Sequence, residues 1–295
     1  MNNYAAEKLQ GFGLELPTLD VPFAIEHLAP AIGTVIRDVD LRQELSDEII
    51  EGIRRVLVAR KVIFFEDQAI TTEQHLAFGQ RFGELEIHPF ASQHPQHPEV
   101  LAITHGRESK GQENLWHSDV TWRQQPSLGS ILRAIEVPTV GGDTLFCCME
   151  TAYQRLPDAI KEAIEGKTAR HDFTHFRAAM IRRGASEEAV AAMNAQYPNP
   201  DHPVVRTHPE SGRKSLYVNR AFTLAINGME PAQSEQLLAV LYHQASHPEY
   251  QCRFKWRNNS IAFWDNRACQ HYAASDYWPA KRQVERVTII GDTPV

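Results

Sequence analysis

The residues best suited to chemistry in this 295-residue chain lie in the segment 114–122, Asn-Leu-Trp-His-Ser-Asp-Val-Thr-Trp. An imidazole and a carboxylate, His117 and Asp119, stand two positions apart. The surrounding residue types predict a strand over Leu115–Trp122, in which side chains two positions apart point to the same side. Two such groups can hold one face of a metal ion. A second histidine would complete the set of two histidines and one carboxylate that leaves coordination positions open.

The pair alone is weak evidence for a metal site. Because the chain contains 14 histidines, a His-x-Asp pattern arises easily by chance. On this evidence alone, a surface histidine beside a hydrogen-bonded aspartate is the better explanation of the pattern. A metal site requires a third ligand from another part of the chain.

Strand and helix signals alternate in the first third of the chain. Gly33–Ile36 and the apolar run Val62–Phe65 are typical of short buried strands, and the apolar spacing over residues 45–57 predicts an amphipathic helix. Thr71 and Gln74 have the spacing of a capping box at the start of a second helix.

From about residue 99 onward, short segments rich in aromatic and β-branched residues dominate. This pattern predicts a closed or double-sheet β architecture with additional helices. We expect strands at Val100–Thr104, Leu115–Trp122, Gly129–Ile135, Thr144–Cys148, Ser215–Asn219, Gln251–Trp256, Ile261–Trp264 and Val284–Ile290. Residues 150–166 and 230–246 have helical spacing. The polar, Ala- and Arg-rich stretch over about 174–203 is long enough to be a lid or a mobile loop.

Composition excludes several classes of protein. A net charge of −7 and a pI near 6.1 would repel a phosphate backbone, so nucleic-acid binding is not expected. No repeat or linker is evident, which favours one domain over 1–295. No apolar run has membrane-spanning length and no signal-peptide pattern is present, so we expect a cytoplasmic protein without membrane contact. The four cysteines form no CxxC pair and are interpreted as reduced core thiols.

A second informative stretch lies near the C-terminus, at 261–272, Ile-Ala-Phe-Trp-Asp-Asn-Arg-Ala-Cys-Gln-His-Tyr, followed by 282–292. Here the chain closely resembles the taurine dioxygenase branch (TauD/TfdA-like) of the Fe(II)/2-oxoglutarate-dependent oxygenases, which includes aryloxyalkanoate and alkylsulfate oxygenases. The resemblance runs from Thr34 to the end, through Lys61–Phe65, Trp116–Thr121, Gly141–Leu145 and Trp264–Arg267. It implies a mainly β fold with a double-stranded β-helix (jelly-roll) core and flanking α-helices.

The resemblance also implies a ligand set. His117, Asp119 and His271 would bind Fe(II), with 2-oxoglutarate as cosubstrate and O2 as oxidant. Arg282 matches the residue that anchors the distal carboxylate of 2-oxoglutarate, and the hydroxyl of Thr144 matches a second donor to it. The planar guanidinium fork suits a carboxylate, whose charge is costly to bury unpaired. The alternative for Arg282 is a surface arginine on the last strand.

Substrate residues follow in the same way. Arg286 lies four positions after Arg282, so the two share one face of a strand. Arg286, His88 and the amide of Val120 match the groups that hold the substrate's anionic end, and Phe222 matches an aromatic residue lining the substrate pocket. Read without the resemblance, His88 and Phe222 are equally well explained as structural residues.

Two departures concern the other end of the substrate. Taurine enzymes have a tyrosine where this chain has Ala91, and an asparagine where it has Glu113. The amine-binding end of the pocket has therefore changed, while the anion-binding end is kept.

The resemblance thus implies hydroxylation of a small organic anion next to its anionic group. Taurine or a related alkylsulfonate is the first expectation, yielding an aldehyde, sulfite, succinate and CO2. Alkylsulfates and aryloxyalkanoates share an anionic head and are alternatives. We expect a homodimer or homotetramer. From other classes, a metal-binding barrel without turnover would need neither Arg282 nor Thr144, and a zinc hydrolase would need a general base that is not evident.

Overall fold

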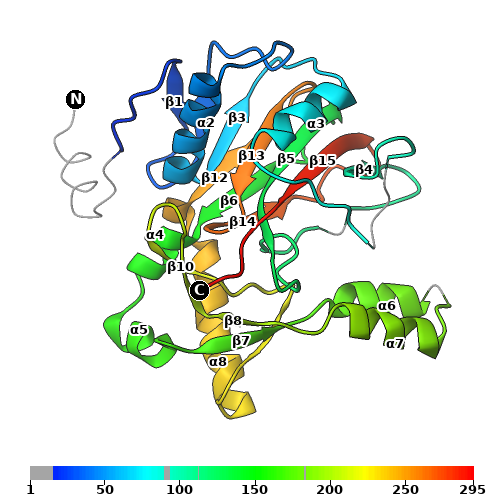
Figure 1. Ribbon diagram of the computed structural model, residues 1–295. Helices are drawn as coiled ribbons and strands as arrows, with labels where there is room; N and C mark the ends of the chain where they lie inside the picture. The colour runs from blue at the N-terminus through cyan, green and yellow to red at the C-terminus, as the bar shows by residue number, and fades with distance from the viewer. Residues whose placement is uncertain (1–15, 90–93, 112, 183) are drawn as a thin grey trace.

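The fold is built around a large mixed sheet. The structure, a computed structural model, describes residues 16–89, 94–111, 113–182 and 184–295. The largest sheet has the strand order β1-β2-β3-β13-β5-β15-β4 (Figure 1). Its strands are β1 (Ile25–His27), β2 (Thr34–Ile36), β3 (Val62–Phe65), β4 (Val100–His105), β5 (Ser127–Glu136), β13 (Ile261–Asp265) and β15 (Arg282–Ile290).

A three-stranded sheet packs against the large one. It has the order β12-β6-β14 and consists of β12 (Gln251–Phe254), β6 (Thr144–Cys148) and β14 (Cys269–Ala273). Phe64 of β3 stacks on Phe254 of β12 with ring centroids 4.0 Å apart, which places the two sheets face to face. The expected mainly β fold with a jelly-roll core is confirmed.

Alternation along the strands creates two apolar layers, one on each side of the large sheet. Phe263 of β13 joins the layer that packs under the helices α2 (Asp47–Arg60) and α3 (Thr72–Gln80), while its neighbour Trp264 joins the layer between the sheets. Because successive side chains of a strand point to opposite faces, this one strand supports both layers.

The helices begin where their caps predict. Ser46 accepts a hydrogen bond from the amide of Ile49 at the start of α2, and the expected capping box of Thr71 and Gln74 opens α3. The helix expected over 150–166 is divided by Pro157 into α4 (Met149–Gln154) and α5 (Asp158–Ile164), because proline lacks the amide that a continuous helix would need.

The remaining elements lie toward the C-terminal half. Their bounds are α6 (Thr174–Arg182), α7 (Glu187–Gln196), α8 (Pro231–His243), β7 (Thr168–His171), β8 (Asp201–Pro203), β9 (Val205–Thr207), β10 (Lys214–Leu216) and β11 (Thr223–Ile226). They form a β11-β7-β8 sheet and a β9-β10 pair. Two 3₁₀ turns, Gln244–Ser246 and Pro248–Tyr250, follow α8.

The stretch 174–203, which was expected to be a lid or a mobile loop, is largely helical rather than a loop. It forms the pair α6 and α7, which extends away from the sheets (Figure 1), before ending in β8. Ser186 caps the start of α7 by accepting a hydrogen bond from the amide of Ala189. The Ala-rich composition that was interpreted as loop-like favours helix instead.

Two expected strands were also wrong in extent. Leu115–Trp122 contains only an isolated bridge between His117 and His271, after which the chain turns and Val120 has a positive φ of 47°. In place of Ser215–Asn219, the strand is Lys214–Leu216. Strand-like composition reflects burial as much as pairing, so buried turns can carry it too.

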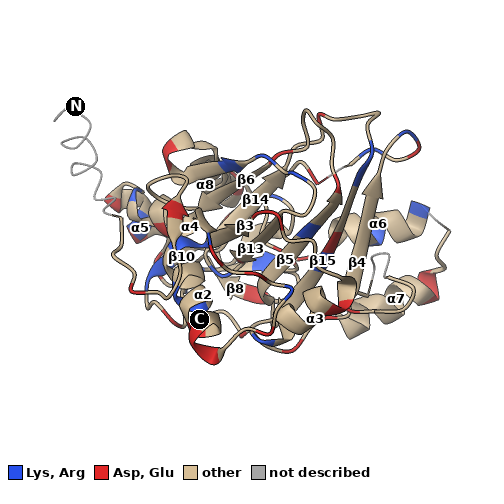
Figure 2. Ribbon diagram, turned by 90° about the horizontal axis from the view of Figure 1, so that it is seen from above, with Lys and Arg blue, Asp and Glu red and all other residues tan. Residues whose placement is uncertain are grey.

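The charged residues, the cysteines and the helix lengths complete the description of the fold. Viewed from above, β5, β15 and β4 lie side by side, and residues of both charges are spread over the elements (Figure 2). All four cysteines are buried and unbridged, as expected. Among the described residues, none of the helices is both long and apolar enough to cross a membrane.

The helix-side layer gives a direct test of the packing. Phe263 is fully buried and its ring contacts that of Phe82 at a centroid distance of 4.9 Å. Phe263→Ala should lower the free energy of unfolding by about 3–5 kcal/mol, because it leaves a cavity between sheet and helices. Urea denaturation measures the change. The control Val140→Ala, at a side chain 80% exposed, should change it by less than about 0.5 kcal/mol.

Candidate active site

Three potential metal ligands converge between the turn 117–119 and strand β14. His117, Asp119 and His271 each present a ligand atom, and these atoms lie within 4.8 Å of one another. Oδ1 of Asp119 is 3.8 Å from Nε2 of His117 and 4.0 Å from Nε2 of His271. The turn therefore brings the first two ligands together as the sequence predicted, although no regular strand does so.

The backbone fixes the spacing of the two histidines. The amide of His117 donates to the carbonyl of His271 at 3.1 Å, and the amide of His271 donates back at 2.8 Å. The two rings consequently face each other with centroids 4.2 Å apart.

Hydrogen bonding also sets which nitrogen of His117 is available. Nδ1 of His117 lies 2.7 Å from the carbonyl of Leu115, which can only accept. Nδ1 must therefore carry the proton, so Nε2 keeps its lone pair for a metal.

Burial determines the charge state of the other two ligands. Burial lowers the pKa of His271 to about 3, so this imidazole is neutral and able to ligate. Burial alone would raise the pKa of Asp119, but the guanidinium of Arg286 beside it holds this pKa well below its usual range. Two imidazoles and one carboxylate form a donor set that fits a divalent iron.

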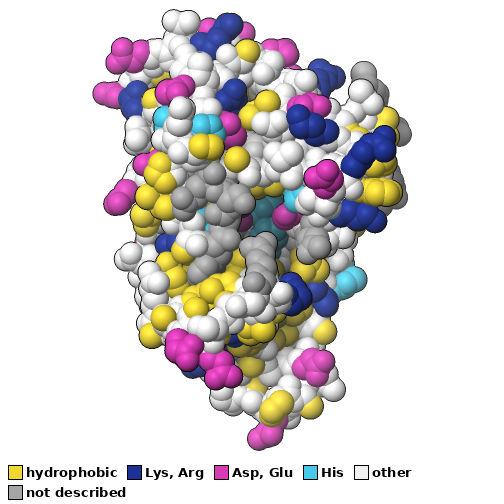
Figure 3. All heavy atoms as spheres, turned by 90° about the vertical axis from the view of Figure 1, so that its right-hand side faces the viewer, with side chains coloured by type: hydrophobic (Ala, Val, Ile, Leu, Met, Phe, Trp, Pro, Cys, Tyr) yellow, Lys and Arg dark blue, Asp and Glu magenta, His cyan; other side chains and the backbone are white. Residues whose placement is uncertain are grey.

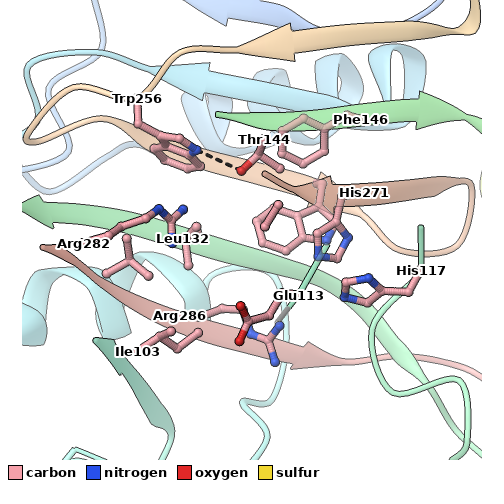
Figure 4. A pocket seen from close by; sticks show the side chains of 13 residues that line it. Ile103, Glu113, His117, Leu132, Thr144, Phe146, Trp256, His271, Arg282 and Arg286 are labelled. Atoms are coloured by element: carbon pink, nitrogen blue, oxygen red, sulfur yellow. Dashed lines mark hydrogen bonds between the residues drawn. The ribbon is translucent and has the colours of Figure 1, made fainter. Parts of the chain in front are cut away.

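A pocket extends from the ligands along the space between the sheets (Figure 4). Its lining includes His117, His271, Thr144, Arg282 and Arg286. Figure 3 shows a hollow on one face of the molecule in which histidine and acidic side chains are visible between hydrophobic ones.

Arg282 is a buried cation with an unused donor. Its side chain is 6% exposed, and its Nε has no hydrogen-bond partner among the described residues. None of the carboxylates that the structure describes lies within ion-pair distance of Arg282. Burial lowers the pKa of Arg282, but a guanidinium remains charged in proteins. A buried charge without a partner is costly, so this position is suited to an anionic ligand.

Thr144 offers a second donor at the same end of the pocket. Its Oγ1 accepts a hydrogen bond from Nε1 of Trp256 at 2.9 Å (Figure 4). Because the indole can only donate, the hydroxyl hydrogen of Thr144 is free to point elsewhere. Trp256 also lies under Arg282, with the guanidinium carbon 5.8 Å from the ring centroid.

Arg286 lies at the other end, against the metal ligands. Its Nη1 donates to Oδ1 of Asp119 at 2.7 Å, while its Nε is buried without a partner within the described residues. Arg282 and Arg286 both line the pocket from β15, as their spacing predicted. Glu113 also lines it, with one carboxylate oxygen 3.3 Å from Nε2 of His105.

The remaining predicted substrate residues lie in an adjoining apolar cluster rather than in the lining of this pocket. Phe222 contacts the ring of His117 at 6.3 Å, and Val120 is buried in the same cluster as Phe222. His88 is buried beside Trp122, with ring centroids 6.1 Å apart, and burial together with Arg286 and Arg123 lowers its pKa to about 3. Ala91 lies outside the described residues.

Some residues of the site escaped the sequence analysis. Phe176 of α6 stacks on Phe222 at 6.4 Å and lies 5.5 Å from His88, but it falls in the stretch interpreted as a loop. Ser130 and Asn266 contact Asp119. Asn266 lies within a quoted motif, whereas nothing in the sequence distinguishes Ser130 from any other strand serine.

Comparison with known proteins agrees with this geometry. The family model described as taurine catabolism dioxygenase TauD, TfdA family matches residues 24–288. An alpha-ketoglutarate-dependent sulfate ester dioxygenase of Pseudomonas putida is 35% identical over 279 residues, covering 92% of this chain and 90% of that protein. An alpha-ketoglutarate-dependent 2,4-dichlorophenoxyacetate dioxygenase of Cupriavidus pinatubonensis is 31% identical over 285 residues, covering 91% of this chain and 98% of that one.

A solved structure shows the same relationship. The crystal structure of a taurine dioxygenase from Burkholderia xenovorans is similar with a TM-score of 0.79 and 35% identity, covering 92% of this chain and 91% of that chain. The family match spans most of the sequence, and two histidines and an aspartate of this chain lie together. This protein is therefore a dioxygenase that belongs to the TauD, TfdA family.

Proposed function

We propose that this dioxygenase uses Fe(II) and 2-oxoglutarate to hydroxylate a small organic sulfonate, with taurine and related alkylsulfonates as the first candidates. His117, Asp119 and His271 would hold the iron. Arg282 and Thr144 would hold 2-oxoglutarate, and Arg286, His88, Val120 and Phe222 the substrate.

The observation that carries the proposal is the buried, unpaired guanidinium of Arg282. Its Nε lacks a partner in the described structure, and Thr144 beside the same pocket has a hydroxyl hydrogen to give. A metal site alone needs neither group. A cosubstrate with a carboxylate far from the atoms that reach the metal would satisfy both.

The residues of the chain would bind and orient the iron, the cosubstrate and the substrate, and these bound groups would carry out the reaction. Iron, 2-oxoglutarate and O2 together supply the oxidising chemistry, in which one oxygen atom enters the substrate and 2-oxoglutarate becomes succinate and CO2. Arg282 and Thr144 would orient the distal carboxylate of 2-oxoglutarate. The buried walls around His271, formed by Trp264 and Phe146, exclude water from the ligands.

The substrate's anion would lie near Arg286. This guanidinium adjoins Asp119, so an anion bound to it would hold the neighbouring carbon close to the metal ligands. His88, which is buried near Arg286 and therefore neutral, would add a polar group at this end. Hydroxylation of the carbon bearing a sulfonate lets the C–S bond break, releasing sulfite and an aldehyde.

A sulfate ester is the second candidate substrate. It presents the same three terminal oxygens as a sulfonate, and a relative at 35% identity is a sulfate ester dioxygenase. Its hydroxylation would release sulfate instead of sulfite. Glu113 adds a carboxylate to the pocket lining. Substrates with an ammonium group at the far end should therefore be compared with substrates whose far end is uncharged.

Product analysis across a substrate panel tests the proposal. The iron-loaded protein should form succinate with taurine or an alkylsulfonate and release sulfite in equal amount, and His117→Ala should abolish both because one ligand is lost. His243→Ala, at an exposed histidine outside the site, should retain full activity. Sulfate or a phenol as the main product would move the assignment to sulfate esters or aryloxyalkanoates. Succinate formation by His117→Ala at the normal rate would disprove the ligand assignment.

The two pocket arginines should separate kinetically. Arg282→Ala should raise the KM for 2-oxoglutarate by about 10- to 100-fold, because a hydrogen bond to a charged group contributes about 1.5–3 kcal/mol. Arg286→Ala should raise the KM for the sulfonate instead. Arg257→Ala, at an exposed arginine, serves as the control. Equal effects of both pocket variants on both KM values would contradict the separate roles.

We also propose that the α6 and α7 pair closes over the substrate. Phe176 on α6 reaches Phe222 and His88, which connects the pair to the proposed anion end. Adding 2-oxoglutarate and substrate should protect residues 174–203 from limited proteolysis several-fold. Unchanged cleavage within this segment, in a sample that turns over normally, would remove it from that role.

A further inference from the structure

The two oxygens of Asp119 have different partners. Oδ2 accepts a hydrogen bond from Oγ of Ser130 at 2.8 Å. Oδ1 accepts a hydrogen bond from Nη1 of Arg286 at 2.7 Å and lies 3.8 Å and 4.0 Å from the Nε2 atoms of His117 and His271. The carboxylate is therefore oriented with one oxygen toward the other ligands and one held away from them.

Asn266 holds the backbone of Asp119 and so supports the orientation of its carboxylate. Its Oδ1 accepts from the backbone amide of Asp119 at 3.1 Å and from Nε1 of Trp264 at 3.0 Å. Because the indole can only donate, the atom facing Trp264 must be the carbonyl oxygen, which settles the orientation of the amide.

The amide nitrogen of Asn266 donates to two serine hydroxyls, and one of these serines donates in turn to Asp119. Nδ2 of Asn266 donates to Oγ of Ser130 at 3.2 Å and to Oγ of Ser127 at 2.9 Å. With its oxygen engaged as an acceptor, Ser130 directs its own hydrogen to Asp119. The chain runs from Asn266 through Ser130 to Oδ2.

This chain is sealed from solvent. Ser130 is fully buried, and Asn266 and Asp119 are 1% and 4% exposed. Hydrogen bonds between buried groups are strong, and their partners are not readily replaced by water. Ser130 is a polar residue within strand β5, where the next two residues, Ile131 and Leu132, are apolar. Its buried hydroxyl therefore needs a hydrogen-bond partner, which Asp119 provides.

We propose that Ser130 and Asn266 are positioning residues that keep Asp119 a one-oxygen ligand. This inference rests on the proposed iron site. A carboxylate that bound through both oxygens would take up a coordination position that the cosubstrate or O2 requires. Groups that orient a ligand in this way commonly change metal affinity 10- to 100-fold when removed.

Metal titration in the absence of 2-oxoglutarate and substrate tests the inference. The probe is Co(II), whose visible absorption reports both affinity and coordination. Ser130→Ala should weaken Co(II) binding about 10- to 100-fold, because the carboxylate of Asp119 is no longer held in one orientation. It should also change the shape of the absorption band, because Oδ2 becomes free to approach the metal. Ser130→Thr, which keeps the hydroxyl, should restore the band.

Ser127→Ala is the matched control. Ser127 lies on the same strand, is equally buried and contacts Asn266, but it touches no oxygen of Asp119. Its Co(II) affinity should stay within about threefold of the native protein, and thermal unfolding checks that both alanine variants are folded. A native band and affinity in folded Ser130→Ala, or an equal loss in Ser127→Ala, would overturn the inference. Failure of the native protein to bind Co(II) would instead refute the iron site itself.

Discussion

The pair of backbone hydrogen bonds between His117 and His271 is the constraint on which the site depends. These bonds, 3.1 and 2.8 Å long, attach an irregular turn to the regular strand β14. The hydroxyl of Ser118 adds a further link from the turn to this strand by donating to the carbonyl of Cys269 at 2.7 Å. The amide of Asp119 in turn donates to Asn266 at 3.1 Å. Together these bonds set the spacing of the three ligands beside the pocket.

Strand β15 then carries the cations that an anionic ligand needs. Arg282, Val284 and Arg286 all line the pocket, since alternate residues share a face. Glu285, on the opposite face, pairs with Arg133 at 3.1 Å. The pairing of β15 with β4 and β5 holds these side chains in place. Burying Arg282 without a protein carboxylate is costly, and the proposed anionic ligand would supply the missing partner.

Sequence reasoning predicted the regular parts and the first contacts of the site. The capping box at Thr71 and the alternation that places Arg282 and Arg286 together follow from local patterns. The jelly-roll class was implied by the resemblance to the family. The turn at 119–122 was read as a strand because burial selects the same residue types in both. The helices of 174–196 were read as loop because their sequence is polar. Ser130 could not be found at all, because its role exists only once β5 lies beside the turn.

Substrate variety within the family follows from where each part of the site is anchored. The groups proposed for iron and 2-oxoglutarate lie on or beside paired strands, as Thr144 on β6 and Arg282 on β15 do. The residues proposed to bind the substrate include Phe222, which contacts Phe176 on a helix pair that extends away from the sheets (Figure 1). A change in a protruding helix costs less packing than a change in a paired strand. A substrate-binding end that is built partly on such a helix can therefore diverge while the groups at the metal stay fixed.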